Sequence, residues 1–146
     1  MNPVRNKKSE IFADTQNASR ISNGMNTKEL GFLAEGIARH YLIKKGYKIL
    51  AANYKFNFGE LDVIAQKNNT IIFVEVKALK KEHEGFDPEM RVDYKKQNKL
   101  IKLATAYMLN KKLSDFDWQI DVISVVFDSE NKKAKIKHFK NALNDN

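Results

Sequence analysis

The chain has 146 residues, of which 42% are hydrophobic and none is cysteine. This length is typical of one domain with a single core, and the lack of cysteine excludes disulfides and cysteine-ligated zinc or iron–sulfur sites. A net charge of +8, from 26 basic and 18 acidic residues, favours a polyanionic partner such as nucleic acid. Because the sequence has no apolar stretch of membrane-spanning length and no secretory segment, we expect a cytoplasmic protein without a membrane partner.

Residues 1–24 are rich in asparagine, serine and scattered charges, with no sustained apolar period. Such a composition predicts a flexible N-terminal extension. A single domain is then expected over residues 25–146.

A helix is predicted from Thr27, because apolar residues recur there at intervals of three and four. Asn26 is its expected N-cap, and Glu29 has the spacing of a capping box. Gly46 supplies a suitable C-terminal stop.

Three strands follow, predicted over Tyr47–Asn53, Glu60–Ala65 and Ile71–Lys77. The second and third are short apolar, β-prone runs separated by Asn68-Asn69. Because asparagine tolerates positive φ, these two residues predict a tight primed turn, and hence a β-hairpin.

Charged side chains gather on one face of this hairpin if Lys67 pairs with Thr70, because side chains alternate along a strand. The register then sets Asp62 opposite Glu75, and Glu60 opposite Lys77. Two carboxylates about 5 Å apart repel by about 3 kcal/mol at an effective dielectric of 20. A lysine or a divalent cation such as Mg²⁺ can offset that repulsion. The alternative is a solvated hairpin whose charges form ordinary surface ion pairs.

The rest of the chain completes an α/β pattern. Lys80–Val92 is polar and contains glycine and proline, so it is expected to be either a loop that closes over a substrate or a simple connection. A helix over Tyr94–Asn110, a strand over Trp118–Phe127 and a weak edge strand over Ile136–Phe139 follow. This order predicts a mixed central β-sheet flanked by helices.

Several side chains in these elements allow two interpretations. In the second helix, Leu100, Ile101, Ala104 and Met108 are expected to face inward, and the lysines on its other side meet either phosphates or solvent. The alternating aromatic residues Tyr54, Phe56 and Phe58 could stack on bases, although core packing is favoured for at least two of them. Asp121 could help to arrange a site, but a hydrogen-bonded structural carboxylate is the favoured interpretation.

Ordered motifs give the chain a family resemblance. They are Asn53-Tyr54-Lys55, then Gly59-Glu60-Leu61-Asp62-Val63-Ile64-Ala65, and then Phe73-Val74-Glu75-Val76-Lys77. This set resembles the PD-(D/E)XK nuclease superfamily, and within it the YraN-type family, which is similar in fold to archaeal Holliday-junction resolvases. Further matches are Gly31, Ala34-Glu35, Tyr41-Leu42, Gly46-Tyr47, Lys96-Gln97, Ala106-Tyr107 and Asp121-Val122-Ile123. The resemblance extends from about Thr27 to Phe127 and implies a restriction-endonuclease-like core.

The resemblance implies a metal-dependent nuclease that hydrolyses phosphodiester bonds in DNA, including branched or structured DNA. Asp62, Glu75 and the carbonyl of Val76 would hold Mg²⁺ or Mn²⁺. Lys77 would orient or activate the attacking water and stabilise phosphate charge. Glu35 would complete the site, or else form a helical ion pair with Arg39 four residues on.

Nucleic-acid contacts are expected from basic residues outside this acidic group, namely Lys55, Lys95, Lys96, Lys99 and Lys102. Lysine stands at position 55 where the family favours arginine, so a bidentate grip on phosphate is lost there. Related folds often act as dimers, which makes a homodimer an expectation as well. Two alternatives to a nuclease are a catalytically inactive nucleic-acid-binding module and a basic adaptor or assembly protein.

Overall fold

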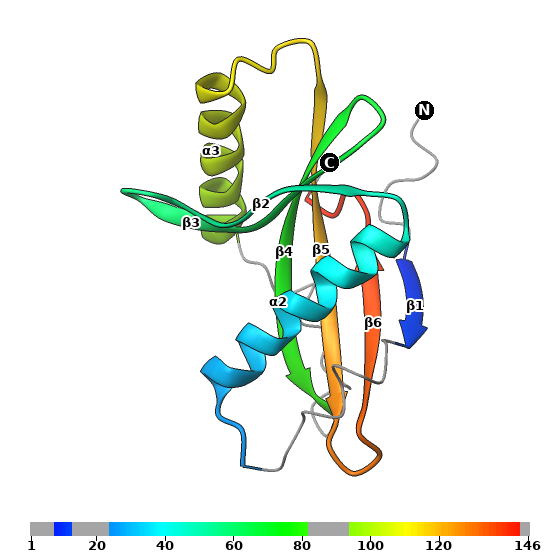
Figure 1. Cartoon of the computed structure of the whole chain (residues 1–146). Helices are drawn as coiled ribbons and strands as arrows, with labels where there is room; N and C mark the ends of the chain where they lie inside the picture. The colour runs from blue at the N-terminus through cyan, green and yellow to red at the C-terminus, as the bar shows by residue number, and fades with distance from the viewer. Residues whose placement is uncertain (1–7, 13–23, 82–93, 144–146) are drawn as a thin grey trace.

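A computed structural model describes residues 8–12, 24–81 and 94–143, and the fold is α/β with a mixed β-sheet. The strands have the order β1-β6-β5-β4-β3-β2; β4 and β5 are parallel and the other neighbours antiparallel (Figure 1). The elements are β1 (Lys8–Phe12), α2 (Thr27–Lys44), β2 (Lys48–Phe56), β3 (Gly59–Lys67), β4 (Thr70–Lys80), α3 (Tyr94–Asn110), β5 (Asp117–Asp128) and β6 (Lys133–Phe139). The predicted fold class is confirmed, and the arrangement is consistent with a restriction-endonuclease-like core.

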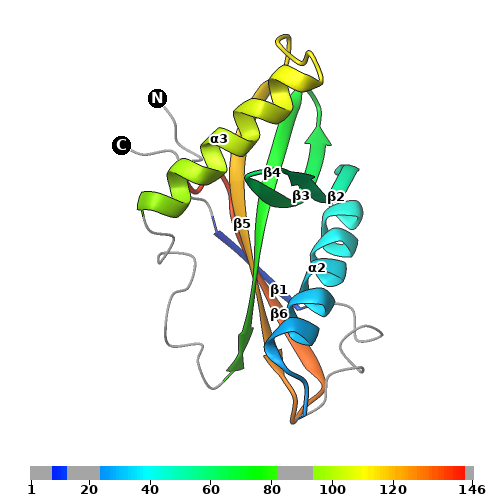
Figure 2. The same cartoon turned by 90° about the vertical axis from the view of Figure 1, so that its left-hand side faces the viewer.

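The two helices cover opposite faces of the sheet (Figure 2). On one face, α2 buries an apolar stripe against residues such as Val63, Val74 and Ile123. On the other face, α3 packs against residues such as Ile64 and Phe73. In the described part of the chain, neither helix is long and apolar enough to cross a membrane.

The β3–β4 hairpin has the predicted register, with Lys67 opposite Thr70 and Asn68 at a φ of 55°. Positive φ at the first central position is what a primed turn requires. The pairing ends at Val63–Val74, where β3 separates from β4. Beyond that point β3 pairs only with β2, and the two strands form an arm that runs past α3 (Figure 1).

This separation corrects one sequence prediction. Glu60 does not lie opposite Lys77; it is exposed on the arm, where its register partner is Lys55 of β2. For the same reason, Asp62 and Glu75 are not ladder partners either. Asp62, Glu75 and Lys77 stay near the point of separation, and Glu60 leaves with the arm.

The helices begin and end close to the predicted positions. Asn26 and Glu29 form the capping box of α2, with backbone-to-side-chain distances of 2.8 and 2.9 Å. Gly46 has a φ of 92°, which favours glycine after the helix end. The inward face of α3 differs from the prediction, because Ile101 is 38% exposed. The buried residues are Leu100, Leu103, Ala104, Tyr107 and Met108.

The N-terminal prediction also needs correction, because no regular structure was expected in residues 1–24. Residues Lys8–Phe12 form β1, which pairs with β6. Accordingly, β6 is an inner strand and not the predicted edge. The remainder of the predicted extension before residue 24, and most of the predicted Lys80–Val92 loop, lie outside the described residues.

A buried polar network joins α2 to β5 and β6. His138 Nε2 lies 2.7 Å from Asp121 Oδ2, and its Nδ1 is hydrogen-bonded to the Tyr41 hydroxyl at 2.8 Å. The other Asp121 oxygen accepts from Gln119 Nε2 and from the backbone N–H of Asn141. Asp121 and His138 are both 0% exposed. Asp121 therefore has the geometry of the structural carboxylate favoured from the sequence.

We predict that Asp121→Ala lowers the free energy of unfolding by roughly 3 kcal/mol, because the buried His138 and the partly buried donors of Gln119 and Asn141 lose their acceptor. Denaturant unfolding would measure this. Asp121→Asn keeps an oxygen for Gln119 and Asn141 and should lose less. Asp128→Ala, at the partly exposed end of the same strand, is the matched control. Equal losses for Asp121→Ala and Asp128→Ala would contradict the prediction.

Candidate acidic site at the separation of two strands

The centre of the candidate site is the Asp62 carboxylate, which occupies the gap between β3 and β4. Its Oδ2 accepts a hydrogen bond from the backbone N–H of Val76 at 2.9 Å. Val76 lies two residues after Val74, the last residue of β4 that pairs with β3. The Asp62 carboxylate thus replaces the backbone acceptor that the Val76 N–H would have in a continued ladder. The contact sets Asp62 beside Glu75, so the structure brings these two predicted residues together with Val76.

Local backbone conformation explains why the strands bend here. The pairs Ala52–Val63 and Tyr54–Leu61 place Asn53 opposite Asp62. Asn53 has a φ of 50°, in the left-handed region that asparagine tolerates better than most residues. The strand β2 therefore changes direction at the same level as β3, which opens the sheet at Asp62.

Glu35 reaches this place from α2. Its Oε1 accepts a hydrogen bond from Asn53 Nδ2 at 2.9 Å. No ion pair between Glu35 and Arg39 occurs among the described residues, so the helical pairing considered from the sequence does not form. Glu35 is instead close enough to add its charge to the environment of Asp62.

Glu75 is buried and forms an ion pair with a lysine. Lys96, in the first turn of α3, places its Nζ 2.7 Å from Glu75 Oε2. The sequence grouped Lys96 with the nucleic-acid contacts, whereas the structure places it on an acid of the candidate site. The ammonium offsets part of the negative charge that two neighbouring carboxylates create.

Lys77 is on the same face of β4 as Glu75, since side chains alternate along the strand. It is partly exposed, and it forms no ion pair within the part of the chain that the structure describes. In an extended strand the N–H and C=O of one residue point to the same side. The Val76 carbonyl therefore points toward the side of β4 on which Asp62 lies.

Burial, and after it the nearby charges of Glu75 and Glu35, raise the pKa of Asp62 to about 7, although the hydrogen bond from the Val76 N–H acts in the opposite direction. Close to neutral pH, the site therefore holds more negative charge than its surroundings accommodate well. A bound cation would relieve this charge.

The donor set suits a hard divalent cation. Among residues 8–12, 24–81 and 94–143, no group of three or more His, Cys, Asp or Glu side chains has the arrangement of a metal site. Magnesium does not need such a group, because it keeps several waters and binds through one or two carboxylates. Asp62, Glu75 and the Val76 carbonyl supply oxygen donors of this kind.

The other predicted contact residues lie on the surface of the protein. Lys95, Lys99 and Lys102 are exposed on α3, and Lys55 is exposed on the arm. Of the three alternating aromatic residues, Tyr54 and Phe56 pack against the α3 core, as favoured from the sequence. The third, Phe58, is 48% exposed.

A family comparison agrees with the motifs. The model of the family described as "Uncharacterised protein family UPF0102" matches residues 34–125. The chain belongs to the UPF0102 family. This range includes Glu35, Asp62, Glu75, Val76 and Lys77, and the match confirms the YraN-type resemblance.

Three relatives named UPF0102 protein extend the match over most of the chain. The one from Alkaliphilus oremlandii is 42% identical over 118 residues, which are 80% of this chain and 98% of the relative. The relative from Caldanaerobacter subterraneus is 40% identical over 120 residues, which are 82% of this chain and 98% of the relative. That from Fusobacterium nucleatum is 43% identical over 104 residues, 71% and 87% respectively.

One residue of the site escaped the sequence analysis as a site residue. Asn53 belongs to the UPF0102-like motif, but its contact with Glu35 was not foreseen. The available signal is its residue type, because asparagine is unusual within a β-prone run such as Lys48–Phe56. An asparagine in that position indicates a local change of backbone direction.

We predict that Asp62→Asn changes how stability depends on pH. The folded state holds the Asp62 proton more tightly than the unfolded chain does, so the wild type loses stability as pH rises from 3.8 to about 7. Asparagine cannot ionise and avoids this loss. The melting temperature of the variant relative to wild type should therefore rise between about pH 5 and pH 8 in a metal chelator.

Adding Mg²⁺ or Mn²⁺ at pH 8 should raise the melting temperature of the wild type more than that of the Asp62→Asn variant. Glu60→Gln is the matched control, because Glu60 is an exposed acid on the same strand. If wild type and Asp62→Asn shared one pH profile, the assigned charge crowding at Asp62 would be wrong.

Proposed function

We propose that this protein is a metal-dependent nuclease that hydrolyses phosphodiester bonds in nucleic acid, with DNA as the expected substrate. The observation that carries the proposal is the position of the Asp62 carboxylate on the backbone of Val76. It joins an acid of one strand to the Glu-X-Lys triplet of the next at a break in the sheet.

Asp62, Glu75 and the carbonyl of Val76 would hold Mg²⁺ or Mn²⁺. When bound, such an ion lowers the pKa of a water molecule and polarises a phosphoryl oxygen. The charge at Asp62 supports this assignment, because its crowding with Glu75 and Glu35 favours a cation there. Glu35 and its hydrogen-bond donor Asn53 would hold the outer side of the site.

Lys77 supplies the positive group for the substrate. It projects beside Glu75 without an ion pair to any described residue, so its ammonium is available to a phosphate or a water molecule. An ammonium close to a scissile phosphate stabilises the negative charge that develops during hydrolysis. Orientation and electrostatics are therefore the role assigned to Lys77. Proton abstraction would require a lowered pKa.

We predict metal-stimulated cleavage by the wild type, and a loss of roughly a hundred-fold or more in Asp62→Asn, Glu75→Gln and Lys77→Met. The assay would offer single-stranded, duplex and branched substrates with a panel of divalent cations. Glu60→Gln, two residues from Asp62 on the same strand, should retain activity because Glu60 lies on the arm opposite Lys55. Cleavage that survives in Asp62→Asn and Glu75→Gln would point to a contaminating nuclease and contradict the proposal.

Lys96 is proposed to compete with the metal for Glu75, because its ammonium already contacts a Glu75 oxygen. Removing it should let the acids bind a cation more readily. We predict that Lys96→Gln lowers the Mg²⁺ concentration at half-maximal thermal stabilisation by about two- to fivefold, which corresponds to an ion pair at a partly exposed position.

The matched control is Lys95→Gln, which removes the neighbouring exposed lysine and leaves the Glu75 contact intact. Both variants lose one positive charge, so a general electrostatic effect would alter them equally. Weaker metal binding in Lys96→Gln would show instead that Lys96 helps to build the site.

The Lys96–Glu75 ion pair also favours a second candidate, a nucleic-acid-binding module without turnover, because it neutralises one acid without any metal. For such a module, binding would be unchanged by chelator and by Asp62→Asn. It would still weaken with salt, as contacts to phosphates do. Absence of cleavage together with this behaviour would favour the second candidate.

A further inference from the structure

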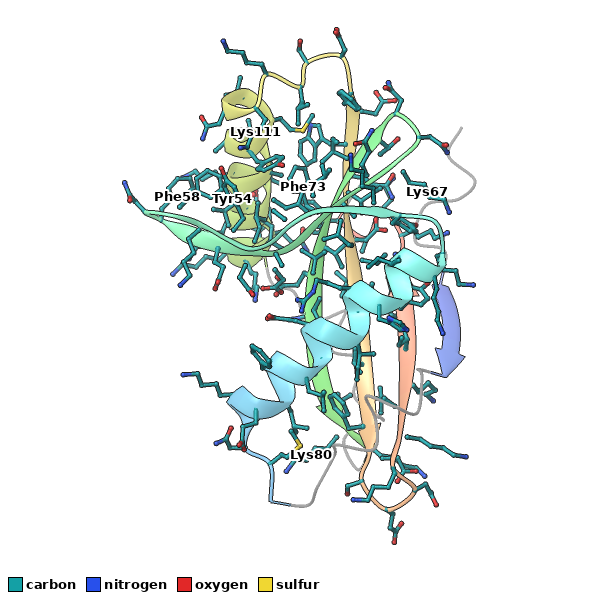
Figure 3. The ribbon with its side chains drawn as sticks, in the orientation of Figure 1. Tyr54, Phe58, Lys67, Phe73, Lys80 and Lys111 are labelled. Atoms are coloured by element: carbon teal, nitrogen blue, oxygen red, sulfur yellow. The ribbon has the colours of Figure 1, made fainter. Side chains whose placement is uncertain are left out.

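A row of aromatic rings extends along the β2–β3 arm from the core beneath α3 to the exposed tip. Tyr107 of α3 contacts Tyr54, with ring centroids 5.1 Å apart. Tyr54 contacts Phe56 at 5.2 Å, and Phe56 contacts Phe58 at 5.4 Å. Phe58 lies farther out along the arm than Tyr54 (Figure 3). The row thus starts at a buried ring and ends at one that is 48% exposed.

The end of the arm rests on α3. A Cβ atom at Gly59 would lie 2.9 Å from Lys99 Cε and 3.2 Å from Leu103 Cδ1. An added Cβ would force the Lys99 side chain to shift and would crowd Leu103, so glycine suits this close approach. Phe58 immediately precedes Gly59, so its backbone lies near the α3 surface that carries Lys99, and its ring contacts that of Phe56.

That surface is basic. Lys95, Lys99 and Lys102 are separated by four and three residues, so they share one face of the helix. All three are exposed, and the aliphatic stem of Lys99 lies under the arm. Lys55 is also exposed, but it alternates with Tyr54 and Phe56 along β2 and therefore projects from the other face of the arm, across from Glu60. The aromatic row thus ends next to the basic face of α3.

We infer that Phe58 is a stacking site for an unpaired base, and that the flanking lysines bind the backbone of the same single strand. Aromatic rings next to basic side chains are how proteins bind single strands without sequence preference, because every base has a π-face. The bases of an intact duplex already stack on one another. The ring therefore selects single-stranded or frayed nucleic acid over a blunt duplex.

This inference rests on the proposed nuclease function for the position of the cleaved bond, and it adds the substrate class. Asp62 lies four positions after Phe58 along the chain, an extended span of about 13 Å. On α3, Lys99 is about one turn from Lys96, which contacts Glu75. A strand whose base stacks on Phe58 can therefore place a nearby phosphate beside Asp62 and Glu75.

Binding in a metal chelator tests the inference separately from cleavage. The probes are a fluorescent single-stranded oligonucleotide and a blunt duplex of the same sequence. We expect Phe58→Ala to weaken single-strand binding by about five- to a hundredfold, the usual effect of removing one stacking partner. Duplex binding should change by less than twofold. Phe58→Leu keeps an apolar side chain without a π-face and should behave like Phe58→Ala.

Two further variants make the test specific. Phe58→Trp retains the stacking surface, so it should bind like the wild type and its indole fluorescence should fall when the single strand binds. Leu109→Ala removes another exposed apolar side chain, at the other end of α3, and should change nothing. Thermal melting would verify that every variant folds.

Unchanged single-strand affinity in Phe58→Ala and Phe58→Leu would overturn the inference, as would equal losses for single strand and duplex. So would a wild type that binds no single strand but captures a protein partner. If Phe58-dependent binding occurs without any metal-stimulated cleavage, the stacking site stands and the nuclease function fails. If metal-stimulated cleavage occurs without Phe58-dependent binding, the nuclease function stands and the stacking site is wrong.

Discussion

The hydrogen bond from the Val76 N–H to the Asp62 carboxylate is the contact on which the candidate site depends. It lies where backbone pairing between β3 and β4 stops, so an acidic side chain satisfies a donor that a neighbouring strand would otherwise occupy. A buried donor without a partner would cost about 1–3 kcal/mol. One carboxylate therefore permits three features together: the break in the sheet, the departure of the arm, and the approach of two acids from different strands.

The site is acidic although the protein as a whole is basic. Asp62, Glu75 and Glu35 concentrate negative charge in one place, while exposed lysines lie on α3 and on the arm. In the proposed nuclease these charges would have two tasks. The exposed lysines would attract a polyanion over a long range, and the short-range field at the acids would favour a small cation. Lys96 links the basic helix α3 to the acidic site, because its ammonium contacts Glu75.

Local pattern was sufficient for much of the fold. The register next to the Asn68-Asn69 turn followed from residue type, because a short turn determines which residues face each other. The limits of α3 were also predicted. Of the residues predicted to face inward, Leu100, Ala104 and Met108 are buried and Ile101 is not, because Leu100, Ile101, Leu103 and Ala104 allow two overlapping apolar stripes. Only packing against the sheet distinguishes them.

The remaining differences arise from contacts between distant segments. The break after Val63 depends on the backbone of Asn53 and on the closeness of Gly59 to α3, and neither is encoded by alternation within β3. Lys95 and Lys96 are adjacent and chemically identical, and only the three-dimensional position of Glu75 gives them different roles. The pairing of Lys8–Phe12 with β6 likewise comes from a partner more than a hundred residues away.

The early end of the β3–β4 ladder also bears on self-association. Among the described residues, the part of β4 from Glu75 to Lys80 pairs only with β5, so its other side is an open strand edge inside the sheet. Such edges are templates on which a strand from another molecule can add. Here the Val76 N–H is already taken by Asp62, and charged side chains at Glu75, Lys77 and Lys80 make the edge unfavourable for a foreign strand. The residues proposed for chemistry are thus also residues that disfavour the addition of a foreign strand at this edge.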